Sequence, residues 1–146
     1  MGWFDFGSTE TKSDQTTSAP LEINWARNPR GRFFRLVHLD PEEQGLSKAH
    51  GVYVIWHGGV KPKWVHLGYT SDLASVMFAA GENEDIMQYE INGRLFVSWS
   101  PVKPSYQPGV AAYLERTLKP LVANPANKKK GVKEVAVKPP SRQTPL

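Results

Sequence analysis

Short apolar runs separated by turn-forming residues outline the first half of this chain of 146 residues. The segment 33–39 is apolar with polar interruptions and is typical of a strand. Residues 51–57 and 63–68 are rich in β-branched and aromatic side chains, and Gly58-Gly59 lies between them. The pattern therefore predicts two further strands that pair as a hairpin.

Helical signals follow the strand 33–39 and the predicted hairpin. Residues 40–43, Asp-Pro-Glu-Glu, have the order of a helix start, with a capping residue, a proline in the first turn and acids near the positive end of the dipole. Ser71-Asp72 can cap a helix from Leu73 to about Ala80, which should stop before Gly81. Residues 86–91 fit neither period and stay ambiguous between helix and strand.

Residues 94–99 alternate as a strand does. We expect Leu95 and Val97 on one face, with Phe96 and Trp99 nearer the other.

A last helix is predicted after Pro108-Gly109, and Pro120 should bend or end it. The order of hairpin, helix, strand and helix predicts an α/β domain in which helices flank a short central mixed or antiparallel sheet. The apolar stripe of the last helix would comprise Val110, Leu114, Leu118 and Leu121.

The composition fits one ordinary domain. Hydrophobic residues make up 40% of the chain, five of them are Trp, and there is no cysteine, so disulfides and thiolate metal sites are excluded. No apolar run approaches the roughly 18 residues that a membrane span needs, and no signal peptide opens the chain. We therefore expect a soluble, cytoplasmic protein.

The net charge of +4 is concentrated at the C-terminus. Residues 127–146 hold six basic residues and one acidic residue, a net of +5, so the rest of the chain is at −1. We therefore predict a domain over residues 20–127 and a flexible basic tail over 128–146 that could bind nucleic acid. The lysines expected to do so are Lys128, Lys129, Lys130 and Lys133.

Residues 1–19 are rich in Ser, Thr and charge, and are predicted to form a flexible arm. The arm opens on an aromatic cluster of Trp3, Phe4 and Phe6. That cluster could dock on a protein partner or fold back onto the domain, and the sequence leaves both alternatives open.

Two short motifs stand at the predicted hairpin. Gly51-Val52-Tyr53 is followed, after a gap of 12 residues, by His66-Leu67-Gly68. Glu115 in the last helix and Asn127 beyond it complete an ordered set. Over residues 33 to 127, this arrangement resembles the GIY-YIG nuclease family.

The resemblance implies hydrolysis of a phosphodiester with one divalent metal ion, Mg²⁺ or Mn²⁺. It implies that Tyr53 orients or activates the nucleophile, that Glu115 holds the metal, and that Asn127 supports the site from behind. Two plainer interpretations stay open. Tyr53 could be a packed strand aromatic, and Glu115 could pair with Lys119 at the surface.

Two departures weaken the nuclease interpretation. His66 stands where the family has a tyrosine, although an imidazole can still act as a base or hydrogen-bonding group. The family's arginine should fall near Ser75 or Val76, but residues 72–80 contain no Arg or Lys. Loss of such an electrostatic contact typically costs about 10²–10³ in rate, and Arg94 is a weak substitute.

Three hypotheses about function follow. The first is a nuclease-derived module that binds nucleic acid or a protein partner without efficient cleavage. The second is a divergent metal-dependent endonuclease that uses Tyr53, His66 and Glu115 as its catalytic residues. The third is an accessory protein that uses the fold as a scaffold.

Overall fold

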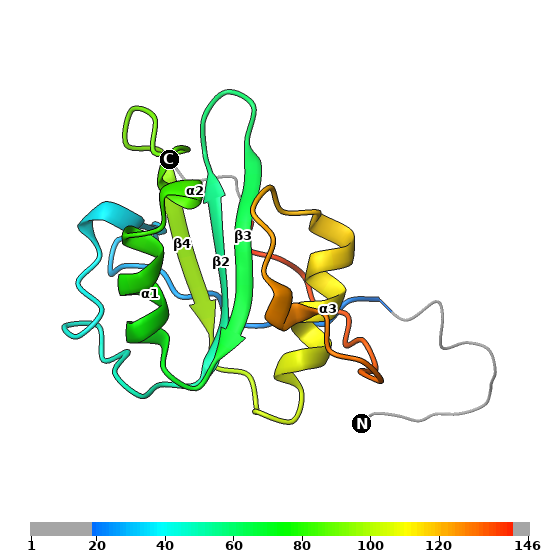
Figure 1. The fold of residues 1–146 in the computed structure, drawn as a ribbon. Coiled ribbons are helices and arrows are strands. Elements are labelled where there is room, and N and C mark those ends of the chain that lie inside the picture. The colour runs from blue at the N-terminus through cyan, green and yellow to red at the C-terminus, as the bar shows by residue number, and fades with distance from the viewer. Residues whose placement is uncertain (1–18, 142–146) are drawn as a thin grey trace.

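Four strands form one antiparallel sheet in the order β1-β4-β2-β3 in the computed structural model, which describes residues 19–141 (Figure 1). β2 (Gly51–His57) is central and lies between β3 (Lys63–Thr70) and β4 (Leu95–Ser100). The two-residue β1 (Phe34–Arg35) pairs with the far side of β4. The predicted α/β class and the predicted hairpin are therefore confirmed.

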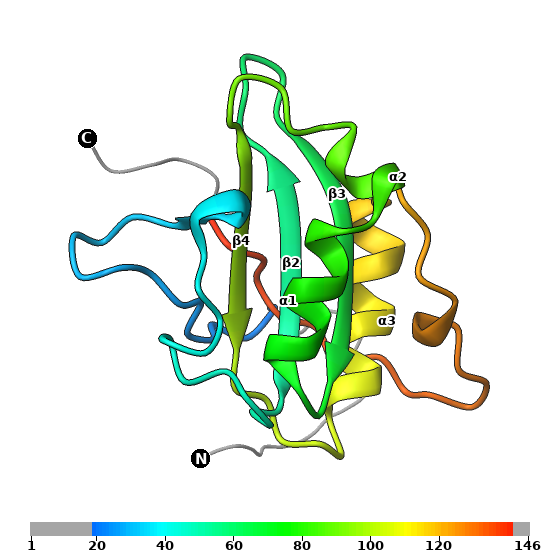
Figure 2. The same ribbon diagram turned by 60° about the vertical axis from the view of Figure 1, so that its left-hand side comes forward.

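Helices cover both faces of this sheet (Figure 2). α1 (Leu73–Gly81) and the short α2 (Glu84–Met87) pack on one face, and α3 (Gln107–Leu118) packs on the other. Strand alternation supplies both layers, because Tyr53 and Ile55 of β2 face α1 whereas Val52 and Val54 face α3. The central strand is consequently buried on both sides.

The expected orientation of Trp99 is wrong. Leu95, Val97 and Trp99 all belong to the core on the α1 side, and Phe96 packs on the α3 side. The period of two places residues 95, 97 and 99 on one face, and the stacking of Trp99 on Phe34 belongs to that face.

The predicted strand 33–39 and the predicted helix from Asp40 are also largely wrong. Only Phe34–Arg35 pairs as a strand, and the 3₁₀-helix η2 (Leu36–His38) follows at once. Residues 41–45 form a turn, which is held to Asp40 by hydrogen bonds from Gln44 N to Asp40 O and from Glu43 N to Asp40 Oδ1. Gly45 at φ +74° ends this turn before a helix can continue.

Two other boundaries depend on local backbone chemistry. The ambiguous segment 86–91 begins inside α2, which Asn83 caps, and continues as a turn. α3 ends at Leu118 because Lys119 adopts the left-handed conformation at φ 51° and Pro120 follows. Leu121 therefore lies outside the helical stripe and is half exposed.

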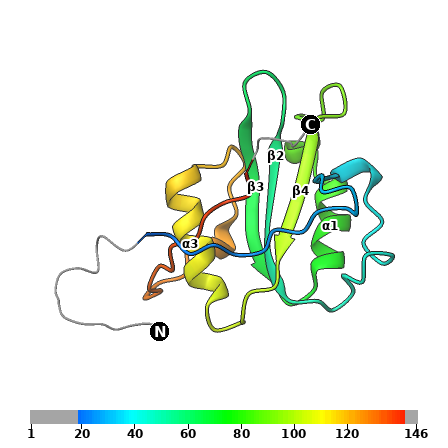
Figure 3. The same ribbon diagram turned by 180° about the vertical axis from the view of Figure 1, so that it is seen from behind.

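Residues that the sequence assigns to a flexible tail form part of the packed body. Val137 is buried and forms a parallel bridge with Leu21, and Lys138 O accepts a hydrogen bond from Trp25 Nε1. The chain segments before β1 and after η3 (Pro125–Asn127) thus lie side by side across the α3 side of the sheet (Figure 3). The predicted boundary at residue 127 therefore leaves packed residues outside the domain. The sequence does not show this, because Val137 pairs with a residue that is distant along the chain.

Within residues 19–141, no helix is both long and apolar enough to cross a membrane. The aromatic cluster Trp3, Phe4 and Phe6 lies outside the described residues.

Candidate functional site

Tyr53 and His66 meet on one face of the β2–β3 hairpin. In the antiparallel register Tyr53 lies opposite Gly68 and Ile55 lies opposite His66, so both side chains point to the same face. The Tyr53 hydroxyl is 3.3 Å from His66 Nε2. Antiparallel pairing of the two predicted motif strands thus brings these side chains together.

The second ring nitrogen of His66 defines the tautomer. His66 Nδ1 lies 3.1 Å from the carbonyl oxygen of Val122, and a carbonyl can only accept, so Nδ1 carries the hydrogen. Burial lowers the pKa of His66, with the Val122 bond and the charge of Glu115 acting in the opposite direction. The ring is therefore neutral near pH 7, and Nε2 accepts a hydrogen bond from the Tyr53 hydroxyl.

Asn124 holds the Tyr53 hydroxyl from the other side. Its Nδ2 donates to Tyr53 Oη at 3.3 Å and to the carbonyl of Leu67 at 3.0 Å. Its Oδ1 accepts from the backbone N–H of Ala126 at 3.2 Å, which orients the amide. The Tyr53 hydroxyl thus accepts one hydrogen bond and donates another.

Burial raises the pKa of Tyr53 to about 12, and the hydrogen bond from Asn124 offsets only part of this effect. A phenol with that pKa stays protonated near neutral pH. In this state Tyr53 has a structural role through its hydrogen bonds and is a poor general base.

The glycine of the second motif has a steric role. A Cβ built on Gly68 would lie 2.7 Å from Tyr53 Oη and would also collide with Asn124 Nδ2. Only glycine leaves room for the hydroxyl and the amide to meet over β3.

Glu115 and Asn127 form the second half of the site. Glu115 Oε1 accepts a hydrogen bond from Asn127 Nδ2 at 2.8 Å, and the same amide donates to Leu67 O at 3.0 Å. Asn127 is only 4% exposed. The alternative pair with Lys119 is not formed, because Lys119 lies beyond the end of α3 in the left-handed conformation.

One backbone segment brings the two halves together. Residues 121–127 run along the outer edge of β3, where Leu121 N donates to Trp64 O and Val122 N donates to Val65 O. The Leu67 carbonyl then accepts from Asn124 and Asn127. The sequence pointed to Asn127 but missed Asn124, whose position just before Pro125 signals only the cap of η3.

The site contains no cation among its described side chains. Arg94 precedes β4, whose Leu95 lies opposite His57 and whose Trp99 lies opposite Tyr53. Five strand positions separate residue 94 from residue 99, or roughly 16 Å, and β4 flanks β2 on the side away from β3. Arg94 therefore cannot substitute for the missing arginine.

Arg116 is no substitute either. It is exposed and forms a bidentate ion pair with Glu134, with N–O distances of 2.9 to 3.1 Å. The neutral His66 supplies no fixed positive charge.

Metal ligands are equally sparse. Within residues 19–141, no three His, Asp or Glu side chains gather closely enough to hold an ion. Glu115 is one carboxylate, and the side-chain oxygen of its partner Asn127 is buried without a hydrogen-bond partner among the described residues. Two oxygens of this kind would leave most of the coordination of a Mg²⁺ ion to water and substrate.

Two cavities lie away from this network. Lys129, Lys130 and Lys133 line the first, of about 650 Å³, beside the start of α3. Lys128 is exposed but does not line it.

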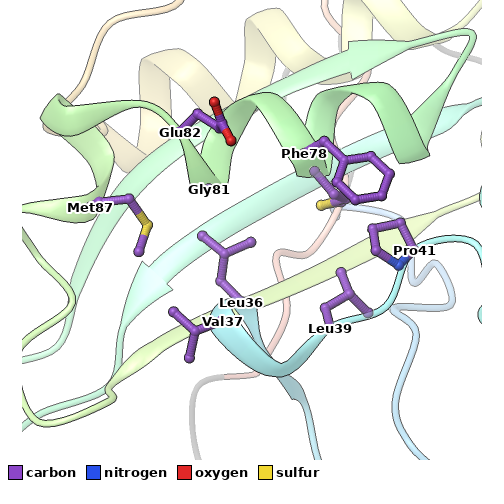
Figure 4. A pocket seen from close by; sticks show the side chains of 9 residues that line it. Leu36, Val37, Leu39, Pro41, Phe78, Gly81, Glu82 and Met87 are labelled. Atoms are coloured by element: carbon purple, nitrogen blue, oxygen red, sulfur yellow. The ribbon is translucent and has the colours of Figure 1, made fainter.

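The second cavity, of about 280 Å³, is an apolar groove between η2 and α1 (Figure 4). Phe78, which is 53% exposed, lines this groove together with Leu36 and Met87.

Comparison of this chain with protein-family models, with curated proteins and with solved structures finds no match.

Proposed function

We propose that this protein is a nuclease-derived module of GIY-YIG-like fold that binds nucleic acid and does not cleave it efficiently. The order and contacts of Tyr53, His66 and the Glu115–Asn127 pair support the family resemblance. The lysines beside α3 support an anionic partner.

The main support for the absence of efficient cleavage in this proposal is the state of the Tyr53 hydroxyl. It is engaged by Asn124 and His66, and its pKa is raised to about 12. A phosphoryl-transfer site needs an activated nucleophile and positive charge at the phosphate. Here the hydroxyl stays protonated, His66 is neutral, and α1 carries no Arg or Lys.

A cleavage assay tests this proposal. The purified protein is incubated with supercoiled, linear, branched and single-stranded DNA and with RNA, in Mg²⁺ and in Mn²⁺, beside a Glu115→Gln variant. The variant keeps an oxygen that can accept from Asn127 while removing the negative charge. We expect both proteins to leave every substrate intact and to retain the nucleic acid in a gel-shift titration.

Two results would contradict the proposal in different ways. Cleavage by the natural protein that disappears in Glu115→Gln would establish the divergent metal-dependent endonuclease. Absence of both cleavage and binding would favour the scaffold hypothesis.

A further inference from the structure

The larger of the two cavities described above lies outside the Tyr53–His66 network and is strongly basic. It occupies about 650 Å³ between the residues that lead into α3 and the segment that follows η3. Ser105 and Tyr106 line one wall, and Lys129, Lys130 and Lys133 line the other. The Tyr106 side chain is 54% exposed.

The lysine-bearing wall is attached to the body at its downstream end. Val135 N donates to Gly109 O at 3.0 Å, and two residues later Val137 is buried and forms a parallel backbone bridge with Leu21. Gly109 permits this close approach, since a Cβ there would collide with the Lys133 carbonyl. The cationic groups are therefore presented on a backbone that is already ordered, which reduces the entropy cost of binding.

The positive charge of this wall has no compensating partner among the described residues. None of the three lysines forms an ion pair with a described carboxylate. The acidic side chain in the lining is Glu134, and its carboxylate is occupied by Arg116. Three like charges around one cavity repel each other, so an anion that enters gains from all three.

We propose that this cavity binds single-stranded nucleic acid, with the lysines on its phosphates and a base stacked on Tyr106. Lysine ammonium groups bind phosphates as point charges, and an exposed aromatic ring beside them is the arrangement that single-strand binding uses. The inference rests on the proposed function and names its binding surface, which is separate from the Tyr53–His66 network. A purely acidic protein partner would use the lysines but would have no need of the ring.

Fluorescence anisotropy of the full chain tests the assignment. The probes are a labelled oligothymidylate of about 20 nucleotides and a duplex of the same length. Replacing Lys129, Lys130 and Lys133 by Gln should weaken oligothymidylate binding by at least about tenfold at low salt and reduce the salt slope by about 2, as expected for three lost phosphate contacts.

A control separates the cavity from general electrostatics. Lys48, Lys61 and Lys63 are exposed lysines elsewhere on the surface, and their triple replacement by Gln removes the same charge. We expect this variant to bind within about twofold of the natural protein, since only contacting cations release counterions. An equal loss of affinity in the two triple variants would overturn the proposal.

The ring is tested separately. Tyr106→Ala should weaken oligothymidylate binding by roughly tenfold and affect the duplex less, whereas Tyr106→Phe keeps the stacking face and should bind like the natural protein. Equal affinity for duplex and single strand, together with no effect of Tyr106→Ala, would refute stacking. Displacement of the probe by polyglutamate as effectively as by unlabelled oligonucleotide would instead indicate an acidic protein partner.

Failure of this inference differs from failure of the proposed function. A natural protein that binds no nucleic acid contradicts both. A natural protein that binds while the cavity variants bind equally well contradicts the cavity alone.

Discussion

The Tyr53 hydroxyl links the side chains of the candidate site through two hydrogen bonds. It accepts from Asn124 and donates to His66, and His66 in turn donates to the Val122 carbonyl. Every member has a partner, and the members come from β2, β3 and the segment 121–127. Such a fully connected, partly buried network stabilises one arrangement of the segments that it joins.

Gly68→Ala should destabilise the protein by about 1–3 kcal/mol, because the new Cβ would displace Tyr53 Oη and Asn124 Nδ2. The control is Gly81→Ala at the end of α1, where a Cβ meets nothing within 4 Å, and a small gain of up to about 1 kcal/mol is expected. Chemical denaturation followed by circular dichroism measures both. Equal stabilities of the two variants would contradict the close packing over Gly68.

His66 should make stability fall as the pH falls. Its folded pKa is lowered from 6.5, so its contribution is fully present above that pH and is lost on acidification toward the folded pKa. The fall in unfolding free energy between about pH 7 and pH 5 should shrink in His66→Gln and persist in His50→Gln, an exposed control. An NMR titration that places the pKa of His66 above 6.5 would contradict this prediction.

At the scale of elements, the segment after α3 protects the edge of the sheet. Residues 121–127 cover the outer edge of β3 with backbone and side-chain hydrogen bonds, so this part of the edge strand is not open to another chain. The turn that starts this segment is Lys119 at φ 51° followed by Pro120. The end of the helix therefore determines where Asn124 and Asn127 arrive.

Lys119→Gly should stabilise the protein by about 0.5–1 kcal/mol relative to Lys119→Ala, because glycine adopts the left-handed conformation without a Cβ clash. Both variants remove the same charge, so their difference isolates the backbone effect. Thermal unfolding measures it. If the alanine variant were as stable as the glycine variant, the left-handed cap would not be the controlling feature.

At the scale of the whole molecule, two segments that are far apart in sequence pair with each other. Leu21 and Val137 form the bridge that joins the first and last described parts of the chain, and Val137 packs into the core beneath α3. The basic segment between η3 and Val137 is thereby attached at both ends.

Val137→Ala should cost about 1–3 kcal/mol of unfolding free energy, because buried methyl groups are lost from a packed core. The matched control is Val60→Ala, because Val60 is fully exposed between β2 and β3, and this change should alter stability by less than about 0.5 kcal/mol. Denaturant unfolding of both variants checks the expectation. An unchanged free energy of unfolding in Val137→Ala would mean that the C-terminal segment contributes little to the stability of the fold.

The sequence by itself determined the elements whose signals are local. Alternation and glycine turns predicted the β2–β3 hairpin, the Asp72 cap predicted α1, and Pro120 predicted the end of α3. The juxtaposition of Tyr53 and His66 also followed, because an antiparallel register relates two positions on neighbouring strands.

Tertiary structure decided the features that depend on distant partners. The pairing of Glu115 with Asn127, the role of Asn124 and the distance of Arg94 from the site depend on which chain segment runs along which strand edge. The same holds for Val137 and for the lysines that gather beside Tyr106. Composition could detect their charge, but hydrogen bonds and burial across more than 50 residues leave no periodic signal in the sequence.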